Sequence, residues 1–360
     1  MPPRTDNSNQ TLIFRSIPQG LPIPGKDLVV EDRPIPTEDG GVLVRINLAS
    51  LDPHIRGQLR DPSISTYEPA LPVGEPISSS VVGTVLKSQS ARLPVGETVW
   101  IMRAPLAEYV AIPTSHVEND RMVVPIGGLV QKLGIDPGHW LGILGIPGLT
   151  GFAGLYEYGR PRSGETVYIS SAAGTVGLVV AFCCKRDGLR VIGSVGSQEK
   201  VDFLRMTGLF DNVFNYRDNS ESCTAALRRL APQGIDIYFA NVGGLQLQAA
   251  VDRMNVHGRV VLCNAIDEYH HSAKSLTWLW QPVIYKRLTF SGFLVTDLAR
   301  KYFPSFQERM IEAVQHDALA DMAPIHVVAG IENAAQAFVD LFQSRKIMGK
   351  LLVRLPTDSS

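Results

Sequence analysis

The chain has 360 residues, 45% of them hydrophobic and 19% charged, and its 34 Lys and Arg and 35 Asp and Glu give a formal net charge of −1. This length predicts two domains, because single hydrophobic cores rarely extend beyond about 250–300 residues. The balanced charge argues against nucleic acid as a partner, the polar residues 1–10 argue against a secretory signal, and the longest uncharged stretch, residues 141–156, is too short to span a bilayer comfortably.

The first predicted domain is mainly β and combines residues 1–138 with residues 318–360. Short apolar runs punctuated by Gly and Pro indicate strands and turns at 41–46, 80–85 and 98–101. The tail returns to strand-like runs at 325–328 and 350–354, on either side of an amphipathic helix at 331–345. We therefore expect the tail to pack back on the first module.

The second predicted domain, residues 139–317, alternates strands with helices. Strands are expected at 166–170, 190–194, 212–215, 235–239, 259–263 and 287–292. Strands that alternate with helices indicate a parallel, doubly wound Rossmann sheet, so the fold class is α/β.

Only four cysteines occur: Cys183, Cys184, Cys223 and Cys263. A secreted protein held together by disulfides would carry more of them for this size. Cys183 and Cys184 fall in a predicted helix and are interpreted as buried free thiols. This cysteine usage favours the cytoplasm.

The segment from Tyr168 to Gly177 is the main chemical signal, because a strand enters a turn of small residues and a helix leaves it. Backbone N–H groups at a helix N-terminus bind pyrophosphate. Gly174 would let the backbone approach the phosphates, and Gly177 would let the helix pack closely on the strand. Ser171 replaces the first glycine of the usual fingerprint. A tight turn without a ligand is the alternative, but six alternating strands and helices favour dinucleotide binding.

The end of the second strand favours NADPH over NADH. NAD enzymes of this fold place an acid there to bind the ribose hydroxyls, whereas this strand ends in Gly193 and Ser194. Lys200 could reach a 2′-phosphate as a cation, and Ser197 could cap the next helix. The alternative is that Lys200 is an ordinary solvated lysine.

Over nearly its whole length the chain resembles the zinc-free leukotriene B4 dehydrogenase/prostaglandin reductase branch of the medium-chain dehydrogenases/reductases, which includes the alkenal double-bond reductases. The segments that carry this resemblance are 51–57, 145–150, 171–177, 196–200, 214–217, 238–244, 263–266 and 349–350. The resemblance implies a GroES-like catalytic module, an NADPH-dependent reduction and a homodimer formed through residues 289–294.

The resemblance also implies a role for each matching position. The residues implied to bind NADPH are Gly174, Thr175, Val176, Gly177, Lys200, Tyr216, Asn241, Cys263, Ala265, Ile266, Phe293, Leu294 and Val295, beside Ser194 from the strand argument. Three positions depart from the family pattern: His54 stands in place of Tyr, Ala240 in place of Asp, and Ile347 in place of an Asn that contacts the cofactor.

No metal site is expected. The catalytic zinc of the wider family needs a Cys and a His in the first module, and no cysteine precedes Cys183. Gly74-Glu75 lacks the adjoining His, and the pair His270-His271 has no partner cysteines.

Tyr269 is the candidate catalytic residue, because it follows the fifth strand at the carboxyl end, where ligands of open α/β sheets bind. Its phenol could hydrogen-bond the carbonyl oxygen of an enone as an enolate forms. The alternative is a tyrosine that is merely packed in the loop. His54, Tyr67 and Trp278 are further substrate-pocket candidates.

Three functions compete on this evidence. The first is reduction of the C=C bond of an α,β-unsaturated ketone or aldehyde. The second is quinone or alcohol oxidoreduction on the same scaffold, and the third is a non-catalytic NADPH-binding role.

Overall fold

The computed structural model describes residues 8–37, 41–119, 123–266, 279–344 and 346–356. The chain forms two compact units, Met1–Leu141 with Ile325–Ser360 and Gly142–Pro324. The unit boundaries at Leu141 and Ile325 lie a few residues after the boundaries at 138 and 318 that the sequence predicts. Within the residues that are described, no helix is both long and apolar enough to cross a membrane.

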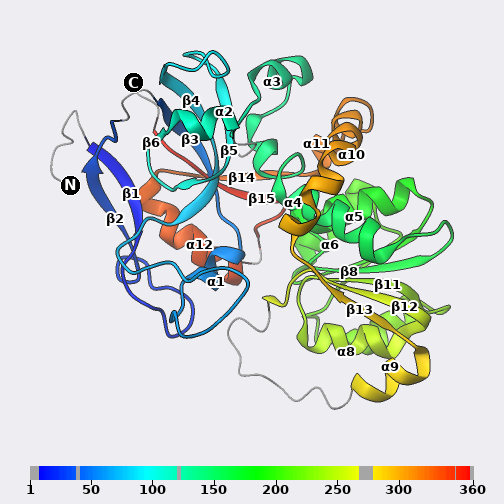
Figure 1. Ribbon diagram of the computed structural model, residues 1–360. Coiled ribbons are helices and arrows are strands. Elements are labelled where there is room, and N and C mark those ends of the chain that lie inside the picture. Colours follow the sequence, from blue (N-terminus) through cyan, green and yellow to red (C-terminus); the bar gives the residue numbers. More distant parts are fainter. Residues whose placement is uncertain (1–7, 38–40, 120–122, 267–278, 345, 357–360) are drawn as a thin grey trace. The chain divides into compact units, whose positions relative to one another are not determined.

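The first unit is mainly β (Figure 1). Its strands are β1 (Ser8–Phe14), β2 (Leu28–Pro34), β3 (Val42–Ser50), β4 (Ser78–Ser88), β5 (Thr98–Pro105), β6 (Tyr109–Ile112), β7 (Val123–Pro125), β14 (Ile325–Ala329) and β15 (Lys350–Arg354). Its helices are α1 (His54–Gln58), α2 (Thr114–Asn119), α3 (Gly127–Leu133) and α12 (Ala334–Gln343), with short 3-10 turns at Pro137–Leu141 and Ile331–Asn333. The tail does pack on this unit, because β15 pairs with β3 and β14 pairs with β15.

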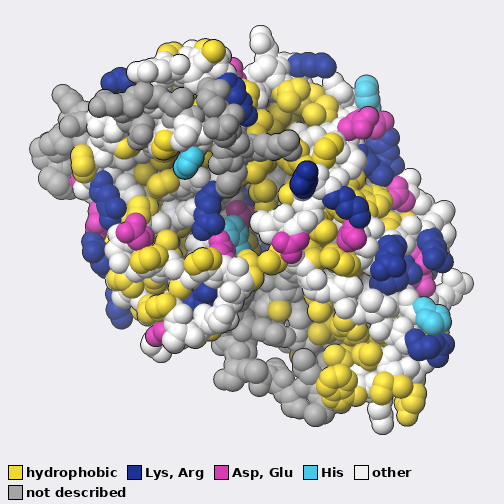
Figure 2. All heavy atoms as spheres, in the orientation of Figure 1, with side chains coloured by type: hydrophobic (Ala, Val, Ile, Leu, Met, Phe, Trp, Pro, Cys, Tyr) yellow, Lys and Arg dark blue, Asp and Glu magenta, His cyan; other side chains and the backbone are white. Residues whose placement is uncertain are grey.

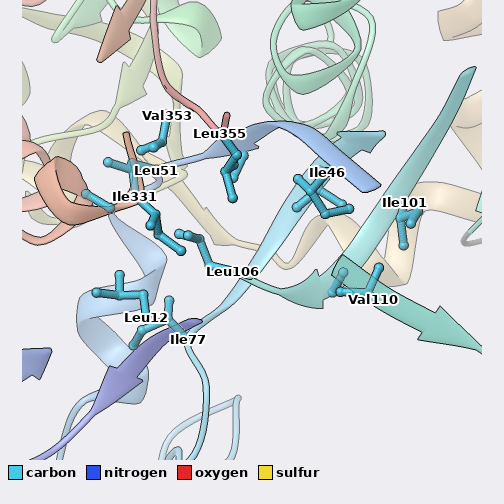
Figure 3. Close-up of a cluster of buried hydrophobic side chains, with 14 of the residues drawn as sticks. Leu12, Ile46, Leu51, Ile77, Ile101, Leu106, Val110, Ile331, Val353 and Leu355 are labelled. Carbon is cyan, nitrogen blue, oxygen red and sulfur yellow. The ribbon is translucent and has the colours of Figure 1, made fainter. Parts of the chain in front are cut away.

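Two sheets build this unit. The larger has the order β14-β15-β3-β4-β5-β7 with β6 added on β3, and the smaller is the antiparallel pair β1-β2. Inward-facing side chains of both sheets form one hydrophobic core, part of which Figure 3 shows around Leu106, Ile77 and Leu12. Ile331 and Phe338 of the tail are fully enclosed in the same core. Burial of this apolar surface holds the first and last parts of the chain together.

The second unit is a Rossmann fold. Its strands are β8 (Thr166–Ser170), β9 (Arg190–Val195), β10 (Asn212–Asn215), β11 (Ile235–Ala240), β12 (Met254–Leu262) and β13 (Thr289–Gly292). Its helices are α4 (Ile146–Gly154), α5 (Thr175–Arg186), α6 (Gln198–Thr207), α7 (Cys223–Leu230), α8 (Gly244–Arg253), α9 (Trp280–Lys286), α10 (Val295–His316) and α11 (Leu319–Met322), and a π-helical turn follows α4 at Leu155–Gly159.

All six strands are parallel, in the order β10-β9-β8-β11-β12-β13. In Figure 1, α4, α5 and α10 cover one face of this sheet and α8 covers the other. The chain order reverses direction across the sheet between β8 and β11, and open α/β sheets bind ligands at the carboxyl ends of strands beside such a point. The α/β fold class is confirmed.

Each predicted strand of this unit coincides with an observed one to within a few residues. The predicted helix at 331–345 is shorter, because Gly330 has a φ of 84° and a 3-10 turn precedes α12. Cys183 and Cys184 are buried free thiols in α5, as the sequence predicts.

Candidate functional site

The turn between β8 and α5 has the geometry of a phosphate-binding loop. Ser171 adopts a left-handed φ of 52°, a conformation that glycine enters without strain, and it occupies the place of the first fingerprint glycine. The N–H of Ala172 then donates to Ser194 O at 3.0 Å, which holds the turn against β9. Gly174 is the N-cap of α5, so the free N–H groups of its first turn and its dipole lie where an anion would bind.

The two glycines of this turn serve different purposes. A Cβ atom at Gly177 would lie 2.7 Å from Ala172 O, so only glycine allows α5 to approach β8 this closely. A Cβ atom at Gly174 would meet only Ser171 O at 3.6 Å, an ordinary contact, and Gly174 has φ −81°. The protein itself therefore requires Gly177, whereas Gly174 leaves space that only a ligand would need.

We expect Gly177→Ala and Gly174→Ala to separate folding from cofactor binding. Overpacking at Gly177 should cost about 1–3 kcal/mol and lower the unfolding temperature by several degrees. Gly174→Ala should cost under about 1 kcal/mol, the usual effect of alanine at an N-cap, yet raise the Kd for NADPH at least tenfold. Thermal unfolding and a fluorescence titration measure the two effects, and a Gly174→Ala variant with unchanged NADPH affinity would contradict the assignment.

Two cations lie together at the carboxyl ends of β9 and β10. Tyr216 follows β10 and its N–H donates to Val195 O at 3.0 Å. A Cβ atom at Gly196 would lie 3.4 Å from Tyr216 Oη and 3.5 Å from the Arg217 side chain. The Arg217 guanidinium lies 5.4 Å from the centre of the Tyr216 ring. Lys200, in the first turn of α6, completes the group.

Lys200 and Arg217 form a local excess of positive charge. Burial lowers the pKa of Lys200, and the neighbouring Arg217 guanidinium lowers it further. No acid contributes to the pKa shift of Lys200. Neither Lys200 nor Arg217 takes part in an ion pair among the described residues. A partly buried lysine beside an exposed arginine, with no acid paired to either among the described residues, favours an anion as a partner, as a 2′-phosphate would be. The sequence singled out Lys200 and Tyr216; Arg217 was missed, although it directly follows Tyr216.

Ser197 is the N-cap of α6, as predicted, and its Oγ accepts from Lys200 N at 3.4 Å. Ser194, by contrast, is fully buried. Its hydroxyl lies 2.8 Å from Tyr168 Oη and 2.6 Å from Gln246 Oε1. The Ser194 hydroxyl is therefore directed into the interior, and its role at the cofactor stays a prediction.

Asn241 follows β11 and is fastened to β8 through Ser170. Its Nδ2 donates to Ser170 O at 2.7 Å, and its backbone N–H donates to Ser170 Oγ at 2.9 Å. Tyr238 Oη donates to the same Oγ at 3.1 Å. One of the two amide N–H groups is therefore occupied, and the second N–H and the acceptor Oδ1 remain for a ligand.

The segment after β12 runs beside Asn241. Cys263 N and Asn264 N both donate to Ala240 O at 3.0 Å, and Ile266 N donates to Asn241 O at 3.4 Å. The side chains of Cys263, Ala265 and Ile266 in this segment are half-buried. Burial raises the pKa of the Cys263 thiol to about 12, which keeps it protonated near neutral pH.

The third group implied to bind cofactor comes from the end of β13. The Phe293 side chain is closely packed. Its ring lies against Gly154, where an added Cβ atom would be 2.4 Å from it, and its ring centre is 5.8 Å from that of Tyr158. Leu294 is the N-cap of α10 and Val295 begins that helix. All three side chains are half-buried, so each retains some surface for a ligand.

In the first unit, His54 begins α1 and is exposed, and Tyr67 is 64% exposed. The segment before His54 is held by charge: Lys350 pairs with Asp52, and Ser50 donates to the same carboxylate. Both contacts hold the pKa of Asp52 down although burial opposes them.

Ile347 is half-buried and packs against the core of this unit. Tyr269, Trp278, His270 and His271 lie outside the described residues.

Comparisons with known proteins agree with this architecture. Residues 10–119 match the model of the N-terminal domain of oxidoreductases, and residues 175–315 match that of zinc-binding dehydrogenases. The chain is 37% identical to the NADP-dependent oxidoreductase RED1 of Cochliobolus heterostrophus, covering 96% of this chain and 97% of that protein. It is 33% identical to the NADP(+)-dependent 2-alkenal reductase of Nicotiana tabacum, covering 96% and 97%.

Among solved structures, CurA of Vibrio vulnificus in complex with NADPH superposes with a TM-score of 0.85 at 28% identity, covering 97% of this chain and 99% of that one. The matched segments include both units, the phosphate-binding turn and the Lys200–Tyr216 region. The chain belongs to the medium-chain dehydrogenase/reductase family, in its zinc-free branch of NADP-dependent alkenal and enone reductases.

Proposed function

We propose that this protein is an NADPH-dependent enzyme that reduces the C=C bond of α,β-unsaturated ketones and aldehydes. The pair Lys200 and Arg217, which forms no ion pair with an acid among the described residues and lies at a strand end that lacks an acid, is the observation that carries the choice of NADPH. Similarity along nearly the whole chain to a 2-alkenal reductase supports the reaction.

The residues of the second unit fit NADPH from end to end. The first turn of α5, from Gly174 to Gly177, would hold the pyrophosphate, and Lys200, Tyr216 and Arg217 would hold the 2′-phosphate. Asn241 Oδ1 and the half-buried residues Cys263, Ala265 and Ile266 would face the ribose and nicotinamide. Phe293, Leu294 and Val295 would complete the surface from β13.

When bound, NADPH supplies the hydride that the β-carbon of the substrate accepts. Tyr269 would donate its phenolic hydrogen bond to the carbonyl oxygen, where negative charge develops as the enolate forms. The α-carbon can then take a proton from solvent. Direct carbonyl reduction would place a full alkoxide on oxygen, which usually requires a metal or a strong acid. His54, Tyr67 and Trp278 are proposed to contact the remainder of the substrate.

A panel assay tests this function and its competitors. NADPH oxidation should be measured with but-3-en-2-one, a quinone and a simple aldehyde, and NADP⁺ reduction with a simple alcohol, with product analysis for the enone and with the activity repeated after dialysis against a chelator. We expect the saturated ketone as the main product and no loss after chelation. The allylic alcohol as main product, turnover of quinone alone, or no turnover at all would each contradict the proposal.

We also propose that the protein forms a homodimer and that it is located in the cytoplasm. β13 is the outermost strand of its sheet, and no described strand pairs with its outer edge, so a second copy could bind the backbone groups there. Figure 2 shows hydrophobic side chains on the surface over α9, where Trp280, Ile284 and Tyr285 are 65%, 66% and 69% exposed. The four free thiols suit a reducing compartment. Sedimentation at the monomer mass would contradict the dimer.

A further inference from the structure

A glycine ends α4 although the backbone there does not require one. Gly154 has φ −61° and ψ −41°, ordinary right-handed helical values that alanine adopts more readily than glycine. A Cβ atom at this position would lie 2.4 Å, 2.8 Å and 3.1 Å from three atoms of the Phe293 ring, which are the nearest described atoms outside its own helix. The missing side chain at Gly154 therefore makes room for one aromatic ring.

Tyr158, four residues later, packs on the same ring. Residues four apart in a helix lie on one face, so Gly154 and Tyr158 can both meet a single neighbour. The ring centres of Tyr158 and Phe293 are 5.8 Å apart and their planes are inclined by 37°. This separation lies within the range of about 4.5–7 Å that aromatic pairs favour. Gly154 and Tyr158 together fix where the Phe293 ring lies.

The segment that carries Tyr158 is itself fixed on several sides. It is the π-helical turn Leu155–Gly159, a rare geometry that occurs frequently at functional sites. Three hydrogen bonds join this turn to α5, α10 and β12: Tyr156 Oη donates to Asp187 Oδ2 at 2.5 Å, Tyr302 Oη donates to Glu157 Oε2 at 2.8 Å, and Arg259 Nε donates to Gly159 O at 2.8 Å. The Phe293 ring thus packs against a surface that is held in place.

Phe293 directly follows β13 at the edge of the sheet where a cofactor would bind. β13 pairs in parallel with β12, and Gly292 lies beside Leu262, so Phe293 comes next to the start of the 263–266 segment. Open α/β sheets bind ligands outside these carboxyl ends. The Phe293 side chain is half-buried, so the part of its ring that Gly154 and Tyr158 leave uncovered is available to a planar ligand group.

We propose that Gly154 and Tyr158 are positioning residues that hold the Phe293 ring in place as one side of the nicotinamide site. This inference rests on the proposed function, which assigns Phe293 to NADPH, and deepens it by naming residues behind the site that set its geometry. A displaced ring would misplace the nicotinamide, and a misplacement of about 1 Å can cost on the order of 10²-fold in rate. β9 and β10, which bear the proposed 2′-phosphate site, lie at the opposite edge of the sheet.

The test compares two ligands in the full-length protein: NADPH, and adenosine 2′,5′-bisphosphate, which carries the 2′-phosphate but no nicotinamide. We expect Gly154→Ala, which pushes the ring, and Tyr158→Ala, which releases it, each to raise the Kd for NADPH about fivefold or more. The Kd for the bisphosphate should stay within about twofold. With but-3-en-2-one, kcat should fall about tenfold or more in both variants.

Two control variants separate ring contact from general damage. Gly128→Ala adds the same methyl group in helix α3, where no described atom lies within 4 Å of the new Cβ atom. It should leave both Kd values and kcat unchanged. Tyr158→Phe keeps the ring that packs on Phe293 and loses only the hydroxyl, so it should behave as the unmutated protein does.

The outcomes separate this inference from the proposed function. If the unmutated protein does not bind NADPH, the function is wrong and the inference falls with it. If it binds NADPH but reduces no enone, the proposed reaction is wrong, whereas the two Kd values still decide the inference. Unchanged NADPH binding and turnover in Gly154→Ala and Tyr158→Ala would overturn it. Equal weakening of both ligands would also overturn it, because that result indicates damage to the whole unit. Tyr158→Phe losses equal to those of Tyr158→Ala would overturn the role of the ring contact.

Discussion

Replacing Tyr269 by Phe should lower kcat for but-3-en-2-one by a factor on the order of 10²–10³, the usual effect of removing one oxyanion donor. The substitution removes a single oxygen atom and keeps the aromatic ring, so the developing enolate loses only its hydrogen bond. The Kd for NADPH should change little, because the phenol is assigned to the substrate. Stopped-flow or steady-state turnover with a parallel NADPH titration measures both quantities.

Tyr285→Phe provides a matched control, because it removes the same hydroxyl from a side chain that is 69% exposed. It should leave kcat unchanged. A Tyr269→Phe enzyme with full turnover would leave the reaction assignment intact but take Tyr269 out of it. Loss of NADPH affinity together with kcat would instead place the tyrosine at the cofactor.

The second large effect concerns cofactor choice. Lys200→Ala and Arg217→Ala should each raise the KM for NADPH roughly tenfold or more, since each removes a charge-assisted hydrogen bond worth about 1.5–3 kcal/mol. KM for NADH should remain within about twofold, because NADH has no 2′-phosphate. In the double variant the preference for NADPH should largely disappear.

Arg205→Ala is the control for this pair. Arg205 lies on the same helix α6, is 63% exposed and pairs with Asp202 one turn earlier. It should alter neither KM. Equal losses with NADPH and NADH in Lys200→Ala would show that the lysine supports the fold of the site and does not recognise the phosphate.

The sequence by itself determined the features that depend on local patterns. Alternating apolar runs and helical stretches indicated the parallel sheet, and the residues from Ser171 to Gly177 indicated the phosphate-binding turn. Both signals are local, because strand, turn and helix each follow from neighbouring residues. The N-cap at Ser197 could be foreseen for the same reason. The position of Lys200 just past the second strand marked it as a candidate for the 2′-phosphate, whereas Tyr216 was supplied only by the family resemblance.

Only the tertiary structure decided which polar side chains are available. Ser194 was expected at the cofactor, but pairing of β9 with β8 turns its hydroxyl toward Tyr168. Strand direction fixes which face a side chain takes, and that choice depends on the partner strand. Arg217 became part of the proposed anion site only when β10 was placed beside β9.

Long-range contacts account for the remaining differences. β1 and β2 pair with one another, and Asn9 in β1 exchanges hydrogen bonds with the backbone of Tyr109, so no local window contains that pattern. The Arg60 guanidinium donates to three backbone carbonyls, that of Gly57 in α1 and those of Ile64 and Glu68 in the segment after it, and these have no sequence signature, since every residue carries a carbonyl. Which of them meet one guanidinium depends on the path of the folded backbone, and that path is set by packing of the core beneath it.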